Sequence, residues 1–218
     1  MEYSGVKIDW LGHSAFRLTA GKKVVYIDPY NIKPAAPADI ILISHEHFDH
    51  CSVEDVQKVL KSNTVIITTA AAKDKLRSVW PNVRGLLIAP GQSYDIDGIR
   101  IEAVPAYNMN KFRSPGVPYH PQQSGGVGFV FSIGGIRVYH AGDTDIVPGI
   151  EQHLKDIDVA IVPVSGSYVM TPEEAATFVK MIRPKLAIPM HIKSVVGTEA
   201  DARRFKELVG MSCEVAIL

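Results

Sequence analysis

The chain has 218 residues, 46% of them hydrophobic, and its 23 Lys and Arg residues balance its 23 Asp and Glu residues. That length suits one large α/β domain, and the charge balance argues against a broad basic surface for nucleic acid. No stretch is apolar over the roughly 18 residues that a membrane span needs, and the amino terminus shows no signal-peptide pattern. We therefore expect a soluble cytoplasmic protein in which residues 1–218 form a single domain.

Short apolar runs broken by Gly, Pro, Asn and Asp predict strands through the first half of the chain. These runs are 6–10, 15–20, 23–28, 39–44, 64–69, 85–89 and 99–105. Helical spacing predicts helices at 52–62, where Ser52 is the expected N-cap, and at 70–80. The irregular stretch 105–126 follows, and a loop of that length is more often functional than idle.

The second half predicts a hairpin over 127–143, with Gly134 and Gly135 at its turn, and then alternating helices and strands. The helices are expected at 145–155, 171–183 and 199–210, and the strands at 158–164, 185–190 and 213–218. Thr171 and Glu174 are spaced as a capping box. Two blocks of strands followed by helices predict an α/β (α+β) fold, in which two mixed sheets pack face to face with helices on the outer faces.

The segment SHEHFDH, residues 44–50, places three imidazoles and a carboxylate directly after an apolar run. Such groups are costly to bury unpaired, and together they suit zinc, manganese or iron. Alternate residues of an extended segment share a face, while Glu46 and Phe48 should point away. The spacing therefore divides the four ligand-type residues between two ions, His45 and His47 for one, Asp49 and His50 for the other. A His-rich surface turn is the less favoured alternative.

SHEHFDH resembles the H-x-H-x-D-H signature of the metallo-β-lactamase superfamily. YHAGDT (139–144) resembles the motif whose Asp, here Asp143, bridges two metals, and IPMHI (188–192) the motif whose His, here His191, binds the second metal. WLGHSAF and YIDPY resemble a subgroup of predicted metal-dependent hydrolases with relatives similar to L-ascorbate-6-phosphate lactonase and, more distantly, N-acyl-phosphatidylethanolamine phospholipase D. The resemblance covers essentially the whole chain and implies a four-layer αββα sandwich with the metals at one sheet edge.

One position departs from the family pattern. Many relatives take the third ligand of the first metal from a His directly after the strand that here ends in AVPAYN, where this chain has Asn108. Either His120 from the long loop replaces it, or Asn108 or water completes the site. Pro118 and Pro121 stiffen the surroundings of His120, which favours His120.

Three further residues are expected to support the ligands by hydrogen bonding, because metal-bound imidazoles usually donate their other N–H to a carboxylate or carbonyl. They are His13, Asp28 and His140. Turn capping is the alternative for Asp28, and metal binding the alternative for His140. Cys51 could supply a thiolate ligand, but a small buried side chain is the favoured interpretation.

Two cations bridged by a carboxylate can share a water and lower its pKa towards neutrality, and Asp49 is the expected catalytic group that accepts its proton. We therefore expect a metal-dependent hydrolase that binds two divalent ions. Zinc is the preferred metal, and manganese and iron are the alternatives. A metal-bridging hydroxide is expected to attack a small-molecule lactone, ester or phosphoester. The alternatives are a nuclease of the same superfamily and a non-catalytic metal-binding sensor or scaffold.

Substrate contacts are expected from residues near these motifs, namely Lys111, Arg113, Tyr168 and Lys193. The cations would suit a phosphorylated or carboxylated molecule, with ordinary solvated charges as the equal alternative. We expect a small-molecule substrate, no nucleic acid and no membrane partner, and a homo-oligomer stays open.

Overall fold

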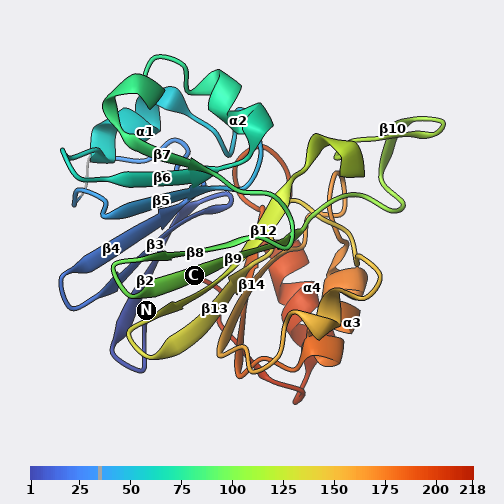
Figure 1. Ribbon diagram of the computed structural model, residues 1–218. Helices are drawn as coiled ribbons and strands as arrows, with labels where there is room; N and C mark the ends of the chain where they lie inside the picture. Colours follow the sequence, from blue (N-terminus) through green and yellow to red (C-terminus); the bar gives the residue numbers. More distant parts are fainter. Residues whose placement is uncertain (34–35) are drawn as a thin grey trace.

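The structure is a computed structural model that describes residues 1–33 and 36–218 (Figure 1). Within these ranges the strands form two seven-stranded sheets and a two-stranded ribbon. The first sheet has its strands in chain order: β1 (Glu2–Tyr3), β2 (Val6–Gly12), β3 (Ala15–Ala20), β4 (Lys23–Ile27), β5 (Ile40–Ile43), β6 (Val65–Thr68) and β7 (Arg84–Leu87). Strands β1 to β4 pair antiparallel, whereas β4 to β7 pair parallel.

The second sheet is also mixed, with its parallel part at one side. In the order of the sheet its strands are β16 (Glu214–Val215), β15 (Leu186–Met190), β14 (Val159–Pro163), β13 (Ile136–His140), β12 (Val127–Ile133), β9 (Ile99–Pro105) and β8 (Ser93–Ile96). Strands β13 to β16 pair parallel, and the remaining pairs are antiparallel. The ribbon consists of β10 (Phe112–Ser114) and β11 (Val117–Pro118) and projects from the body of the molecule (Figure 1).

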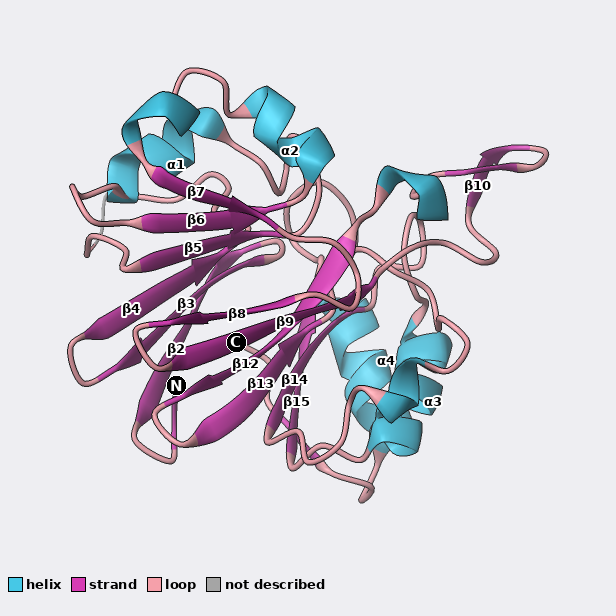
Figure 2. Cartoon of the chain, in the orientation of Figure 1, coloured by secondary structure: helices cyan, strands magenta, loops and turns pink. Residues whose placement is uncertain are grey.

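Helices cover the outer faces of both sheets (Figure 2). Helices α1 (Val53–Val59) and α2 (Ala70–Lys75) share a core with the first sheet, and α3 (Pro172–Ile182) and α4 (Glu199–Val209) pack on the second. Short 3-10 helices lie at Trp80–Asn82, Gln122–Ser124 and Ile150–Gln152. The expected α/β fold with two face-to-face mixed sheets and outer helices is confirmed. None of the described helices has the length and hydropathy to span a bilayer.

Strand β5 shows why the layers form. All four of its residues are apolar and buried. Because side chains alternate along a strand, Ile40 and Leu42 join the core between the sheets, whereas Ile41 and Ile43 join the core under α1 and α2. A strand buried on both faces must be apolar throughout, as the sequence of β5 is.

Local capping signals are confirmed, while three expected boundaries are wrong. The Ser52 side chain accepts from Asp55 N, and Thr171 and Glu174 form the capping box at α3. The helix expected at 145–155 is reduced to Ile150–Gln152, because Pro148 cannot donate a helical hydrogen bond and Gly149 has a φ of +78°. The last strand is only Glu214–Val215, and α2 ends at Lys75 rather than at residue 80.

The carboxyl ends of the parallel strands collect the polar motifs. Asp28 follows β4, residues 44–50 follow β5, Asp143 lies three residues after β13, and His191 follows β15. Pockets commonly form at this edge of a sheet. The two sheets therefore present their predicted metal-binding motifs to one another.

Candidate metal centre

The structure brings the predicted ligand residues together. Their nitrogen and oxygen atoms form three groups, and within each group the atoms lie within 4.8 Å of one another. The groups are His45, His47 and His120; His45, His50 and Asp143; and His13, Asp49, His50 and His191. Residues from both halves of the chain thus form one continuous cluster.

Five buried atoms of this cluster test whether a metal fits there. Among the described residues none of them makes a hydrogen bond of good geometry, and they are His13 Nδ1, His45 Nε2, His50 Nε2, His191 Nε2 and Asp143 Oδ1. Leaving buried polar atoms unsatisfied is costly and uncommon. Imidazole nitrogen and carboxylate oxygen are the donors that zinc and related ions bind. The donor set therefore fits a divalent transition-metal ion.

Hydrogen bonds at Nδ1 fix the orientation of two of these imidazoles. His50 Nδ1 lies 2.8 Å from Asp28 Oδ2. Ser44 Oγ donates to the same carboxylate oxygen at 2.6 Å, so it accepts from His45 Nδ1 at 2.9 Å. With the proton held on Nδ1, each ring presents the lone pair of Nε2 to the cluster. Asp28 thus stands in the supporting position expected from the sequence.

Asp143 lies between the groups. Its Oδ1 is 3.2 Å from His50 Nε2, and its Oδ2 is 3.0 Å from His191 Nε2 and 3.3 Å from His120 Nε2. Burial would raise the pKa of Asp143, but the imidazoles of His191 and His50 hold that pKa well below its usual range. A carboxylate that stays ionised and faces imidazoles on both sides is well placed to contact a metal ion.

Two buried histidines respond to their surroundings in opposite directions. Burial lowers the pKa of His45 well below its usual value, so its ring is neutral and able to bind a metal. Burial also opposes protonation of His50, but Asp143 and Asp28 raise its pKa well above the usual value. The position of His50 between two carboxylates therefore favours a positive charge, which a metal ion would supply in place of the proton.

Residues 44–50 form a turn rather than the expected extended segment. The backbone N–H groups of His50 and Cys51 both donate to His47 O, at 3.0 and 2.8 Å. Alternation of side chains is therefore the wrong reason for the grouping. His45 and His47 share one group and Asp49 and His50 another, but His45 and His50 also meet in the third group with Asp143. Phe48, expected to point away, lines a cleft above the cluster.

His120, and not Asn108, lies among the donors. His120 Nε2 is 3.1 Å from His47 Nδ1. Asn108 Oδ1 instead accepts from the backbone N–H of His120 at 2.8 Å and lies 2.9 Å from His120 Nδ1, while its Nδ2 donates to Tyr168 O at 2.9 Å. The amide is thus committed to orienting His120, and the geometry favours His120 as the third donor beside His45 and His47.

The other two supporting residues differ in their closeness to the cluster. His140 Nε2 lies 3.0 Å from Ser14 O, and its Nδ1 accepts from Gly142 N at 3.3 Å. It therefore shapes the turn before Asp143 and does not reach the donors. His13 Nε2 lies 2.9 Å from Asp49 Oδ2 and belongs to the donor group itself, closer than a purely supporting role requires.

Sequence reasoning missed two serines. Besides Ser44, Ser165 Oγ lies 2.8 Å from His191 Nδ1 and orients that ring. Ser44 could have been noticed as the first letter of SHEHFDH. Ser165 gives no comparable signal, because its closeness to His191 depends on the pairing of β14 with β15.

Cys51 faces away from the cluster, as the favoured interpretation has it. Its Sγ lies 3.6 Å from Ala72 O in the core under α1 and α2. Burial raises the pKa of the thiol to about 12. A buried, protonated thiol is a poor metal ligand.

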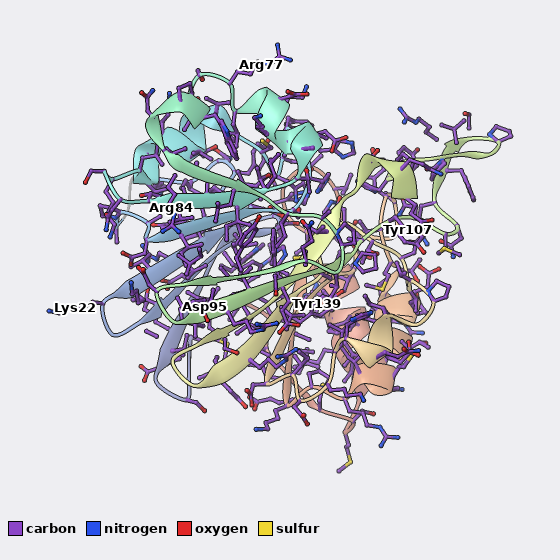
Figure 3. All side chains as sticks on the ribbon, viewed as in Figure 1. Lys22, Arg77, Arg84, Asp95, Tyr107 and Tyr139 are labelled. Carbon is purple, nitrogen blue, oxygen red and sulfur yellow. The ribbon has the colours of Figure 1, made fainter. Side chains whose placement is uncertain are left out.

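A cleft of about 260 Å³ opens onto the cluster. Its described lining consists of His47, Phe48, Asp49, Tyr119, His120, Asp143, Tyr168, His191 and Val195. Tyr168 is thus at the cleft as expected, whereas Tyr119 and Val195 were not singled out from the sequence. The loop that follows β9 lies beside the segment that follows β13, because the carbonyl of Tyr107, labelled in Figure 3, accepts from Asp145 N at 3.0 Å.

The expected contacts of three cations with substrate are not supported. Lys111 Nζ lies 2.7 Å from Glu174 and 3.4 Å from Asp145, and the residue is outside the described lining of the cleft. Arg113 lies on the exposed strand β10, outside the lining of the cleft. Lys193 Nζ lies 3.7 Å from Glu199 and 5.4 Å from the Trp10 ring, and it is also outside the lining.

Comparison with known proteins agrees with this geometry. The family model described as a beta-lactamase superfamily domain matches residues 7–191. A UPF0173 metal-dependent hydrolase of Thermococcus onnurineus is 31% identical over 98% of this chain and 96% of its own. One from Thermoplasma acidophilum is 34% identical over 94% and 91%. The crystal structure of a candidate metal-dependent hydrolase from Parabacteroides distasonis superimposes with a TM-score of 0.84, at 32% identity over 97% and 92% of the two chains.

Proposed function

The chain belongs to the metallo-β-lactamase superfamily and, within it, to the UPF0173 family of metal-dependent hydrolases, and on that premise we propose that it hydrolyses a small uncharged ester or lactone. The observation that carries this proposal is the cluster of unsatisfied imidazole and carboxylate donors at the floor of the 260 Å³ cleft. Of these donor residues, His191 and Asp143 line the cleft, so a small molecule can reach them from it.

The cluster offers two sets of ligands. His45, His47 and His120 would hold one divalent ion, Asp49, His50 and His191 the other, and Asp143 would contact both. When bound, such ions lower the pKa of water and stabilise negative charge on the scissile group. We favour zinc because of the His and Asp donor set, with manganese and iron as the alternatives.

The residues of the chain supply orientation and a place for the proton. Asp49 lines the cleft, and its Oδ2 is held 2.9 Å from His13 Nε2. We assign to Asp49 the acceptance of the proton that the attacking water loses. His13 keeps the carboxylate fixed during that transfer, and the hydrogen bonds of Asp28 and Ser165 keep the rings of His50 and His191 in place.

Charge in the cleft favours an ester or lactone over a phosphoester. None of its nine described lining residues is Lys or Arg, so a phosphate outside the metal centre would lack a counter-charge. A nuclease would need a basic path for a phosphate backbone.

A substrate screen tests the proposal. Protein loaded separately with zinc, manganese or iron is assayed against a panel of lactones, carboxylic esters and phosphodiesters by acid release. We expect turnover of at least one lactone or ester, and a loss of about a hundredfold or more in kcat for Asp49→Asn. Turnover of phosphodiesters alone would favour the nuclease, and metal binding without turnover of any class would favour a sensor or scaffold.

A further inference from the structure

The wall of the cleft differs in chemistry from its floor. Five of the nine lining residues belong to the donor cluster. One wall residue, Val195, is aliphatic, and the other three are aromatic: Phe48, Tyr119 and Tyr168. A cleft with a polar floor and an apolar wall suits a molecule whose reactive group lies against the donor cluster and whose apolar substituent packs against the wall.

The aromatic rings of the wall are held in place by other rings. The ring centroid of Phe48 lies 5.7 Å from that of Tyr30, edge to face, and that of Tyr119 lies 4.7 Å from that of Tyr168 in the same arrangement. Such pairs are favourable geometries for aromatic side chains. A ring that already packs against another ring loses less conformational freedom when a ligand binds than a ring without such a contact.

Two wall residues are strongly exposed although they are apolar. The side chain of Phe48 is 65% exposed and that of Val195 is 38% exposed. Exposed apolar residues are common on protein surfaces, but these two stand beside the candidate catalytic centre. An apolar substituent packed on them would remove this surface from water, which is favourable.

The wall is also fixed relative to the reacting centre. Phe48 lies between His47 and Asp49 in the chain, and Tyr119 directly precedes His120. The carbonyl of Tyr168 accepts from the Asn108 amide that orients His120. Because the aromatic residues are linked to ligand residues by one peptide bond or one shared amide, their distance from the scissile bond is set by the same turns that place the donors.

Charge and size narrow the class of substituent. An anionic group against this wall would be desolvated without a cation, since the nearby Lys111 and Lys193 are paired with acidic residues and lie outside the lining. The volume of about 260 Å³ is slightly below the roughly 300–1,000 Å³ common for ligand sites. The cleft therefore suits a compact neutral group.

We infer that the substrate carries an uncharged aromatic group, about one ring in size, next to its scissile bond, and that Phe48, Tyr119 and Tyr168 select it. This inference rests on the proposed ester or lactone hydrolysis and names the substrate class for the same site.

A matched series of ethyl esters tests the inference. Acid release by the metal-loaded protein is measured for ethyl phenylacetate, ethyl acetate and monoethyl succinate, which share one leaving group. We expect kcat/KM for the phenylacetate ester to exceed the other two values by at least about tenfold. In Phe48→Ala and Tyr168→Ala this ratio should fall to within about threefold, while Phe112→Ala, an exposed aromatic residue of the ribbon, should keep it. Equal rates for all three esters, preference for succinate, or an unchanged ratio in both wall variants would overturn the inference.

Binding of the product acids separates this inference from the proposed function. If none of the three ethyl esters is hydrolysed, the proposed function is decided by the wider screen of lactones and esters, and selectivity of the wall is measured by titrating phenylacetate, acetate and succinate into the metal-loaded protein calorimetrically. At least about tenfold tighter binding of phenylacetate, lost in Phe48→Ala but kept in Phe112→Ala, supports the aromatic wall. Equal binding of the three acids contradicts it.

Discussion

At the scale of single residues, His120 supplies the proposed donor atom of the first site and Asn108 orients it. Asn108 follows β9, where the family pattern led us to expect a metal ligand, yet both its oxygen and its nitrogen are used in hydrogen bonds. His120 lies two residues after β11, the second strand of the ribbon, and faces His47 and Asp143. The amide therefore acts through the imidazole that it orients.

Replacing these two residues should have graded effects on metal binding. His120→Ala should lose about one metal ion per chain, because it removes a donor. Asn108→Ala should keep the His120 donor but weaken metal binding by about 10–100-fold, as is common when a hydrogen-bond partner of a metal-bound histidine is removed. Metal per chain is measured by mass spectrometry after dialysis against limiting zinc. Gln123→Ala, an exposed change in the same loop, is the control. Full occupancy in His120→Ala would remove it from the ligand set.

The sequence could predict which site residues lie close together in space only where those residues are also close in the chain. His45, His47, Asp49 and His50 lie within six positions, and a turn of that length must keep them near one another. Ser165 and the wall residue Tyr119 were harder to place, because their contacts depend on sheet pairing and on the path of a long loop. The ion pair of Lys111 with Glu174 was hard to foresee for a related reason, because the two residues are 63 positions apart in the chain.

At the scale of elements, one carboxylate fixes the start of α1 to the segment that follows β4. Asp55 accepts from Asn31 N at 2.8 Å, from Ile32 N at 3.0 Å and from Ser52 Oγ at 2.6 Å. Burial would raise the pKa of Asp55, but the hydrogen bonds from Ser52, Lys58 and the two backbone amides lower it below 3.8. A carboxyl group with a lowered pKa stabilises the fold in its ionised form.

Asp55→Asn should therefore destabilise the protein in a pH-dependent way. We expect a loss of about 1–3 kcal/mol in the free energy of unfolding, because the backbone amides lose a charged acceptor. The difference from wild type should stay constant from pH 7 to about pH 4 and shrink as pH falls below 3.8, where the wild-type carboxyl group itself becomes protonated. Urea unfolding at several pH values measures it, with the exposed Asp74→Asn as control. A difference that grew on acidification would contradict the assignment.

Elements defined by local chemistry agreed best with sequence expectation. The Thr171 capping box and the Gly134–Gly135 turn need only neighbouring residues, and both are present. Strands β8, β10 and β11 went unpredicted because they are two to four residues long and owe their form to pairing partners. The expected helix at 145–155 is broken at Pro148 and Gly149, and Asp145 instead accepts from the backbone of Met109 and Asn110.

At the scale of the whole molecule, the cluster joins the two sheets at one edge. His45, His47, Asp49 and His50 follow the first sheet, whereas Asp143 and His191 follow strands of the second. Ions shared between them would add to the stability of both halves and would anchor the ribbon through His120. The single-domain organisation and the cytoplasmic location expected from the sequence stay predictions.

Removal of metal should loosen this junction. Metal bound far above its Kd adds about 4 kcal/mol, so chelation should lower Tm by roughly 10 °C in a chain of this size. The ribbon should become more sensitive to protease, with cleavage between residues 109 and 119, because His120 loses its partner ion. Thermal unfolding and limited proteolysis are compared before chelation, after it and after zinc is restored. Identical Tm and cleavage in all three states would show that the ions, if bound, do not tie the halves together.

Metal content tests most directly whether one cluster binds two ions. Native mass spectrometry counts the ions on the purified wild-type chain, on Asp143→Ala and His191→Ala, and on Asp74→Ala as an exposed control. We predict two divalent ions for the wild type and the control, and at most one for either cluster variant, because Asp143 faces both donor groups and His191 completes the second. A wild-type chain without metal, or cluster variants that keep both ions, would contradict the account.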